Sequence, residues 1–222
     1  MIIPAALLVV AKAPIPGLAK TRLAATLGDV VAADIAAAAL LDTLDAVSAT
    51  PVARRVVAMT GDLALACRSA EIAERLGDFI VVEQRGDGFA DRLANAHADA
   101  SSAADGLPVV QIGMDTPQVS ADLLGRCAAE LAGTDAVLGM ARDGGWWVLG
   151  VTSPSSAECL RDVPMSTAET GAVTLAALRD TGLAVTLVPE LADVDTIDDL
   201  SDVRRACRPD SRFHAATQTA EV

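Results

Sequence analysis

Residues 11–22, AKAPIPGLAKTR, decide the fold expected of this chain because they join an apolar segment to a short helix. The preceding residues 2–10 are apolar and predict a buried strand. The following residues 23–27 predict a short helix that ends at Gly28. A strand, a glycine-containing loop and a helix N-terminus in this order are typical of a site that binds anions.

The loop contains Lys12 and Lys20, which are the only lysines in the chain. Lysine is a compact point charge on a flexible stem, so it suits phosphate oxygens at the end of a strand. Gly17 allows the backbone to approach a ligand closely. We therefore predict that Lys12, Lys20 and Arg22, together with Thr21, bind phosphates. The alternative is a solvated loop that contains two lysines by chance. The loop is neither a Walker A motif nor a dinucleotide fingerprint.

Composition and charge restrict the classes of function. The chain has 222 residues, of which 52% are hydrophobic, and this favours one α/β domain. No linker or charge block marks a boundary, so we expect a single domain over residues 1–208 and a polar tail over residues 209–222. The net charge of −13 disfavours DNA or RNA as a partner, although a local cationic pocket can still bind a small phosphorylated ligand.

The cysteines and the apolar runs bear on localisation. The four cysteines lie far apart and form no zinc motif, so we expect reduced thiols in a cytoplasmic protein. No apolar run approaches the roughly 18–20 residues that span a bilayer, so we expect no membrane partner. The sequence does not determine the oligomeric state.

Strands alternate with helices along the chain, which predicts a mainly parallel mixed sheet in a three-layer α/β/α sandwich. The expected strands cover residues 2–10, 55–59, 79–83, 107–112, 135–140, 146–151 and 184–188. The expected helices cover residues 23–27, 30–49, 63–76, 90–104, 121–131, 172–180 and 197–207. In such sheets, ligands bind beyond the carboxyl ends of the strands. The loops expected at that edge are 12–22, 84–89, 113–117 and 141–145.

Several aspartates are candidate metal ligands. Asp115 follows a buried strand, where a carboxylate can hold Mg²⁺ or Mn²⁺ against phosphate oxygens, although it can also cap a turn. Asp143 is a second candidate for metal or substrate. Asp193 and Asp195 can complete a metal site or cap the last helix, as Thr196 also can, and we favour capping.

The two tryptophans and a glycine-rich turn are candidate contacts for the ligand. Trp146 and Trp147 are expected on opposite faces of a strand, with one in the core and the other in the wall of a pocket. Gln84, with Gly86 and Gly88, is expected to contact a nucleotide base. Packing and an ordinary turn are the alternatives for these two groups.

Ser166 and Thr167 form a hydroxyl-rich segment before a helix. One interpretation is a helix cap in which Glu169 pairs with Ser166. The other is that the segment binds an acceptor phosphate or carboxylate at the helix N-terminus.

These motifs occur together and in order, at residues 12–24, 113–117, 143–147, 165–167 and 193–196. The set resembles a bacterial family of GT-A-like proteins usually labelled glycosyltransferase or selenodomain-associated transferase. The resemblance covers roughly residues 5–205. The family is similar to 2-phospholactate guanylyltransferase and, more distantly, to molybdenum cofactor guanylyltransferase, which carry an Ala-Lys-Ser/Thr-Arg-Leu loop and a Gly-Asp-x-Pro turn at matching positions.

The resemblance implies a fold of the nucleotide-diphospho-sugar transferase (GT-A) type. It also implies that the loop takes the nucleotide phosphates and that Asp115 takes the divalent metal. The sequence departs from the pattern of the similar enzymes in two places. The sequence DGGWW at 143–147 replaces a Gly-Thr-rich segment, so the acceptor is not carried over. The Asp-x-Asp motif typical of glycosyltransferases is replaced by Gly-Met-Asp at 113–115.

Three functions remain open at this point. The first is nucleotidyl transfer from a nucleoside triphosphate to a small phosphorylated or phosphonate acceptor, with Mg²⁺ or Mn²⁺ as cofactor. The second is glycosyl transfer from a nucleotide sugar. The third is a non-catalytic protein that binds nucleotides.

Overall fold

The computed structural model describes residues 1–194, 197–218 and 220, apart from the side chain of residue 198. Within these ranges one sheet has seven strands in the order β3-β2-β1-β4-β6-β5-β7. Its strands are β1 (Ile3–Lys12), β2 (Val52–Thr60), β3 (Ile80–Glu83), β4 (Val109–Gly113), β5 (Ala136–Ala141), β6 (Trp146–Val151) and β7 (Val185–Leu191). Strand β6 is antiparallel to β4 and β5, whereas the other paired strands are parallel. The predicted mixed, mainly parallel sheet is therefore confirmed.

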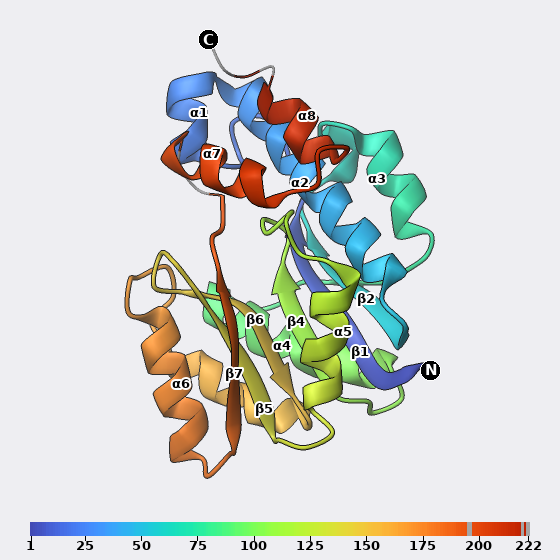
Figure 1. Cartoon of the computed structure of the whole chain (residues 1–222), viewed down its shortest axis with the longest axis vertical. Coiled ribbons are helices and arrows are strands. Elements are labelled where there is room, and N and C mark those ends of the chain that lie inside the picture. Colours follow the sequence, from blue (N-terminus) through green and yellow to red (C-terminus); the bar gives the residue numbers. More distant parts are fainter. Residues whose placement is uncertain (195–196, 219, 221–222) are drawn as a thin grey trace.

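Helices cover both faces of the sheet (Figure 1). The α-helices are α1 (Thr21–Leu27), α2 (Asp29–Ala49), α3 (Ser69–Leu76), α4 (Phe89–Ala103), α5 (Ala121–Glu130), α6 (Thr170–Asp180), α7 (Ile197–Ala206) and α8 (Arg212–Gln218). Two 3₁₀ segments, η1 (Leu63–Leu65) and η2 (Pro154–Asp162), complete the described elements. Helices α2, α3 and α5 pack on one face of the sheet, and α4, α6 and η2 pack on the other. The predicted three-layer α/β/α sandwich is confirmed.

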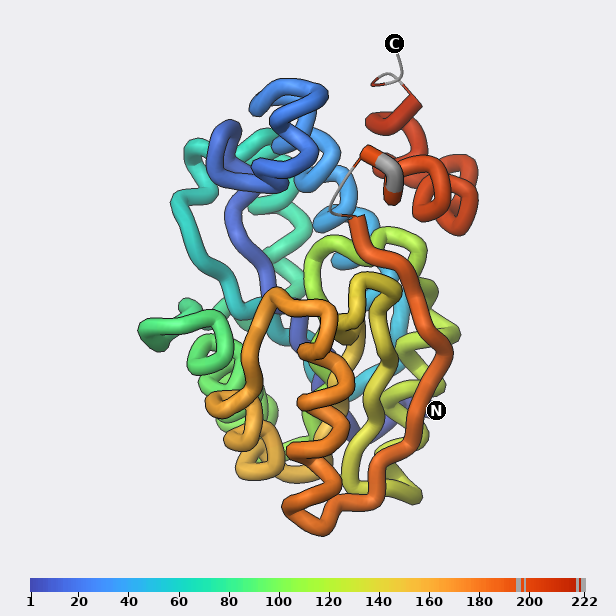
Figure 2. The backbone as a smooth tube through the Cα atoms, turned by 90° about the vertical axis from the view of Figure 1, so that its left-hand side faces the viewer, coloured from blue at the N-terminus to red at the C-terminus, as the bar shows by residue number. Residues whose placement is uncertain are grey.

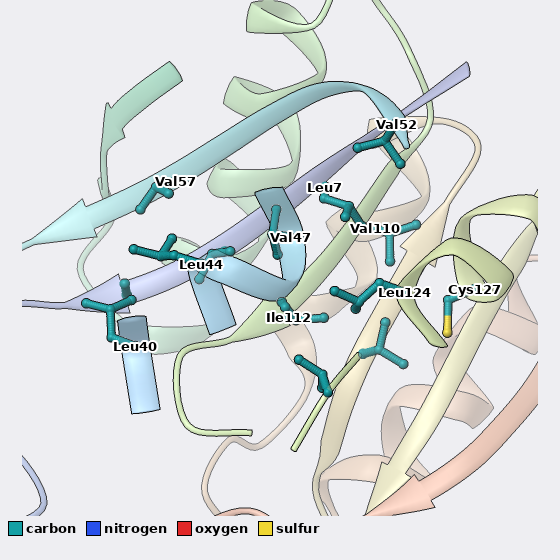
Figure 3. Packing of buried hydrophobic residues seen from close by; sticks show 14 of the residues in the cluster. Leu7, Leu40, Leu44, Val47, Val52, Val57, Val110, Ile112, Leu124 and Cys127 are labelled. Atoms are coloured by element: carbon teal, nitrogen blue, oxygen red, sulfur yellow. The ribbon is translucent and has the colours of Figure 1, made fainter. Parts of the chain in front are cut away.

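Side chains alternate along the central strands and so supply both cores. Leu7 of β1 faces α2 and α5, whereas its neighbour Leu8 faces α4. Figure 3 shows Leu7, Val110 and Ile112 of the sheet beside Leu44 of α2 and Leu124 of α5. Because both faces are covered, β1 is a nearly continuous apolar run rather than an alternating one.

Helix α2 is buried on two sides. Leu40 and Leu44 pack on the sheet, while Ile35 and Ala39 pack under α1, α7 and α8. A helix with apolar residues all round its circumference is expected to be buried in this way. Although α2 is 21 residues long, no helix in the described part of the chain is long and apolar enough to cross a membrane.

The C-terminal segment differs from the predicted polar tail, because residues 212–218 form helix α8 and pack on α2. Asp42 of α2 accepts hydrogen bonds from the backbone N–H groups of Arg212 (3.1 Å) and Phe213 (2.8 Å), so it caps α8 from another helix. The Arg212 guanidinium also pairs with Asp45 at 2.6 Å. The composition of the segment does not reveal α8 because its cap and its apolar contacts come from residues distant in sequence.

The predicted helix over residues 63–76 is instead a 3₁₀ turn, η1, followed by the shorter helix α3. Arg68 has a φ of 53°, a left-handed conformation that interrupts the helix. Its guanidinium pairs with Asp34 of α2 at 2.7 Å, which stabilises this break. A contact between distant segments therefore overrides the local helix propensity.

Replacing Phe213 with alanine tests whether α8 belongs to the fold. The Phe213 side chain has no exposed surface, so Phe213→Ala is expected to lower the free energy of unfolding by about 3–5 kcal/mol. Phe89 is 45% exposed, so the matched control Phe89→Ala is expected to cost less than about 1 kcal/mol. Urea denaturation measures both variants, and equal small losses would contradict the packing of α8.

Candidate functional site

A cleft of about 740 Å³ lies at the carboxyl ends of β1, β2, β4 and β5. Its walls bring together residues from the four loops expected at this edge. Loop 12–22 contributes Lys12, Lys20 and Arg22, loop 84–89 contributes Gln84 and Phe89, loop 113–117 contributes Asp115, and loop 141–145 contributes Asp143. Segments far apart in the sequence thus meet in one site.

An ion pair between Lys20 and Asp115 crosses this cleft. Lys20 Nζ lies 2.7 Å from Asp115 Oδ2, and the two side chains are 12% and 35% exposed. Lys20 is the N-cap of α1 and has a φ of 46° and a ψ of 51°. This left-handed conformation costs about 1–2 kcal/mol in a residue with a Cβ atom, and such backbone strain is concentrated at functional sites.

Lys12 is the last residue of β1 and lines the same cleft. Its Nζ donates to the carbonyl oxygen of Leu18 at 2.9 Å, and its backbone N–H donates to Met114 Sδ at 3.2 Å. Lys12 therefore links its own loop to the turn that contains Asp115. Gly17, which has a φ of 77°, and Thr21, the first residue of α1, are both exposed and lie outside the cleft lining.

Asp193 lies in the cleft with the other acidic residues. Burial, together with the nearby charges of Asp143 and Asp115, raises the pKa of the Asp193 carboxyl to about 6, while the charge of Lys20 opposes this shift. The backbone N–H of the next residue, Val194, donates to the Asp115 carbonyl oxygen at 3.3 Å. Asp193 therefore lines the cleft, while the residues directly before α7, which would show a capping contact, lie outside the described part of the chain. Asp195 and Thr196 lie outside the described residues.

The carboxylates are a partial set of metal ligands. Asp143 already accepts a hydrogen bond from the backbone N–H of Gly145 at 2.8 Å, so one of its oxygens holds its own turn. Within the described residues, no group of three His, Cys, Asp or Glu side chains is arranged to hold a metal ion. Asp115 and Asp193, which both interact with the charge of Lys20, remain as carboxylates of the cleft whose oxygens could hold a cation.

Gln84 has a structural role that restricts its use in recognition. Its Nε2 group donates to the carbonyl oxygens of Ala11 (2.8 Å) and Ala58 (2.9 Å), so it joins the ends of β1 and β2. Only its Oε1 atom is left to contact a ligand, and it can only accept a hydrogen bond.

Gly86 packs against α4, where a Cβ atom would lie 2.7 Å from Asp91 Cβ, and Gly88 is the N-cap of α4. Neither glycine lines the cleft.

The two tryptophans lie on opposite faces of the sheet, as expected. Trp147 is 3% exposed, packs in the α2 and α5 core, and donates from Nε1 to the Pro189 carbonyl oxygen at 2.9 Å. Trp146 is half-buried, packs toward α4 and α6, and lines the cleft. Trp147 also reaches the cleft lining, but its ring is mainly part of the core.

The segment of Ser166 and Thr167 lines the cleft and is locked to the neighbouring loop. Gly171 N–H donates to the Gly144 carbonyl oxygen at 2.8 Å, and a Cβ atom on Gly144 would lie 2.0 Å from the Ala168 carbonyl oxygen. Ser166 has a φ of 60°. Like Lys20, it is a residue of the cleft wall that has a Cβ atom and a left-handed backbone.

The capping box expected between Ser166 and Glu169 does not form. Helix α6 begins at Thr170, and its N-cap, Glu169, makes no side-chain cap. The Glu169 backbone N–H donates instead to Thr167 Oγ1 at 3.3 Å, and Thr170 Oγ1 donates to the Pro164 carbonyl oxygen at 2.8 Å. Thr167 and Thr170 therefore order this segment.

Gln111 and Arg92 are two of the cleft residues that were not singled out from the sequence. Gln111 is the one polar side chain in the buried strand β4, and this interruption of an apolar run is a signal that could have been used. Arg92, in the second turn of α4, carries no such signal because its neighbours are typical of any amphipathic helix.

Asp193 is expected to destabilise the metal-free protein at neutral pH. Its folded-state pKa of about 6 lies above the ordinary value of 3.8, so its contribution to stability is complete below pH 3.8 and is lost as the pH rises through about 6. In a chelating buffer at pH 8, Asp193→Asn should therefore raise the free energy of unfolding by roughly 1–2 kcal/mol, after allowance for solvent screening.

The difference should disappear near pH 4, where the wild-type carboxyl is protonated. The exposed Asp180→Asn serves as the matched control and should change the unfolding free energy by less than about 0.5 kcal/mol at either pH. A pH-independent effect of Asp193→Asn in urea denaturation would contradict this electrostatic environment.

Several solved structures have the same fold as this chain. A protein from Desulfovibrio desulfuricans G20, assigned as a nucleotide-diphospho-sugar transferase, matches with a TM-score of 0.83 and 24% identity over 99% of this chain and 95% of that chain. The manganese complex of Rv0371c from Mycobacterium tuberculosis H37Rv matches with a TM-score of 0.54 and 19% identity over 90% of this chain and 97% of that chain. CMP:2-keto-3-deoxy-manno-octonic acid synthetase complexed with CTP matches with a TM-score of 0.54 and 12% identity, over 96% and 99% of the two chains.

These similarities confirm the predicted fold of the nucleotide-diphospho-sugar transferase (GT-A) type. A comparison with curated protein sequences gave no significant match. Residues 43–167, more than half of the chain, match the family described as "Uncharacterized protein conserved in bacteria (DUF2064)", and the protein therefore belongs to that family.

Proposed function

We propose that the protein is a metal-dependent transferase that uses an activated nucleotide, and that its reaction is nucleotidyl transfer from a nucleoside triphosphate to a small anionic acceptor. The observation that carries this proposal is the Lys20–Asp115 ion pair, which lies in a cleft with Lys12, Arg22 and Asp193. Cations for phosphates and carboxylates for a metal ion are thus within one site, as phosphoryl chemistry requires.

The donor chemistry of the cleft fits a hard divalent cation. Asp115 and Asp193 offer oxygen ligands only. Burial, followed by the charges of Asp143 and Asp115, raises the pKa of Asp193, so a cation would relieve the repulsion between these carboxylates. Mg²⁺ is commonly held by one or two carboxylates together with substrate phosphates, so a set of two is sufficient. When bound, the ion would neutralise charge on the phosphate oxygens. The related Rv0371c structure contains manganese, which supports Mn²⁺ as an alternative.

In the proposed reaction, an oxygen of the acceptor attacks the α-phosphorus of the nucleotide and forms a new P–O bond. The bond between the α-phosphorus and the bridging oxygen breaks, and pyrophosphate leaves with that electron pair. Lys20 exchanges Asp115 for a phosphate oxygen, which its flexible stem allows. Lys12 and Arg22, from the same loop, stabilise the negative charge that develops on the leaving group.

The number of cations favours nucleotidyl over glycosyl transfer. Lys12, Lys20 and Arg22 all line the cleft, and a triphosphate carries more charge to neutralise than the diphosphate of a nucleotide sugar. The synthetase with the same fold was solved with CTP, which supports a triphosphate as the ligand. Glycosyl transfer remains the second candidate because Trp146 is half-buried in the cleft, where its ring could stack on a sugar.

Product analysis tests the reaction. Incubation with each nucleoside triphosphate, Mg²⁺ or Mn²⁺, and a panel of small phosphates and phosphonates should release pyrophosphate. Release of a nucleoside diphosphate from nucleotide sugars would establish the second candidate instead. Thermal stabilisation by nucleotides without turnover, across the whole panel, would leave a non-catalytic nucleotide-binding protein.

Lys20→Met and Asp115→Asn are each expected to weaken binding of a nucleoside triphosphate with Mn²⁺ at least about tenfold, because each removes a charge that contacts phosphate or metal. Thermal shift as a function of nucleotide concentration measures this loss, with each variant compared with its own ligand-free melting temperature. Asp122→Asn, at an exposed position of α5, is the matched control and should bind as the wild type does. Wild-type affinity in both cleft variants would exclude the proposed site.

A further inference from the structure

The cleft has a second end whose polar groups the nucleotide site does not use. This end lies on the α4 side of the sheet and is lined by Phe89, Arg92, Gln111, Trp146 and Met165. Figure 2 shows that α4 and η2 lie side by side, away from the C-terminal helices α7 and α8. The two ends of the cleft are therefore built by different layers of the fold.

Arg92 is a cation without an acidic partner at this end. It is half-buried, and among the described residues no carboxylate forms an ion pair with it. Its neighbour Asp91 is held by Arg161 at 3.0 Å and does not neutralise it. The Arg92 guanidinium lies 5.8 Å from the centre of the Phe89 ring, and its Nε atom is buried without an acceptor in the described part of the chain. An uncompensated guanidinium on a cleft wall attracts an oxyanion, for which its planar donors are suited.

Gln111 is a second, independent sign of a ligand at this end. Its side chain is only 1% exposed, and its Oε1 atom is buried without a donor among the described residues. Gln111 is paired in the sheet with Leu8 and Leu149, so its side chain is on the α4 side, where it lines the cleft. A buried acceptor in this state is normally satisfied by an N–H or O–H group.

Trp146 contributes a third unfilled hydrogen-bonding position. Its Nε1 atom is likewise buried without an acceptor among residues that the structure describes. An indole N–H is a donor only, and Gln111 Oε1 is an acceptor only. A hydroxyl group can satisfy both, since it accepts one hydrogen bond and donates another.

We propose that the α4 side of the cleft is the acceptor subsite, and that it takes a small hydroxyl-bearing organic oxyanion whose anionic group pairs with Arg92 and whose hydroxyl group donates to Gln111 Oε1. This inference rests on the proposed function only in naming the ligand an acceptor. Arg92 and Gln111 thus select the acceptor, while Lys12, Lys20 and Arg22 bind the nucleotide.

The test uses four probes of similar size on the full-length protein. Glycerol 3-phosphate, 3-hydroxypropylphosphonate and glycerate carry hydroxyl groups with a phosphate, a phosphonate and a carboxylate, respectively, and glycerol is uncharged. Both tryptophans line the cleft, so quenching or enhancement of tryptophan fluorescence reports occupancy, and calorimetry measures the same titrations independently. At least one anionic probe should bind at millimolar concentration or below, and glycerol should not.

Arg92→Gln is expected to weaken binding of that probe at least about tenfold, and Gln111→Leu to weaken it several-fold. Arg179→Gln, at an exposed position near the C-terminal end of α6, is the matched control and should bind as the wild type does. Equal affinity in Arg92→Gln and Arg179→Gln would overturn the subsite. So would binding of glycerol at the same strength, or no response of the wild type to any anionic probe.

A parallel titration with nucleoside triphosphate and Mn²⁺ separates this inference from the proposed function. If the protein bound an anion through Arg92 but bound no nucleotide, the proposed transferase function would be excluded. The inferred anion site would then stand without it. If Arg92→Gln weakened nucleotide binding as strongly as it weakens anion binding, Arg92 would belong to the nucleotide site. This result would overturn the subsite.

Discussion

The ion pair between Lys20 and Asp115 is the interaction on which the site depends. It joins the loop after β1 to the turn after β4; the Lys20 side chain is largely shielded from water, and that of Asp115 is partly exposed. Partial burial makes such a pair stronger than a surface pair, but removal of either partner leaves a charge without compensation. The ion pair therefore holds the groups for phosphate and metal together, in a chain whose net charge of −13 would otherwise repel a nucleotide.

The C-terminal helices complete this site from outside the three-layer core. Helices α7 and α8 cover the face of α2 that the sheet leaves open, and they share an apolar cluster with Leu23 of α1. Asp193 lies on the connection between β7 and α7, and Val194 beside it is buried in that same cluster. The packing of the last two helices therefore fixes both the position of α1, which follows Lys20, and that of a carboxylate opposite it.

The site retains features that cost stability. Lys20 and Ser166 have left-handed backbones, and the Asp193 carboxyl is partly buried near two other carboxylates. Gln111 has a buried oxygen without a donor among the residues that the structure describes. Two of these costs depend on the absence of a ligand, since a cation would relieve the repulsion at Asp193 and a hydrogen-bond donor would satisfy Gln111. The extensive apolar core on both faces of the sheet allows the fold to tolerate these costs.

The sequence by itself determined the strands, most helices and the edge of the sheet at which the loops meet. Alternating strands and helices place the carboxyl ends of parallel strands at one edge, so Lys20 and Asp115 could be predicted to share a site. Tertiary structure alone decided which groups are free to act. Gln84 gives its donors to Ala11 and Ala58, and Gly86 packs on α4, because strand ends and helices converge there. It also decided that α8 is a helix, since Asp42 caps it across more than 160 residues of chain. Local patterns encode periodicity, whereas caps, pKa values and unpaired polar atoms depend on neighbours that only the folded chain brings together.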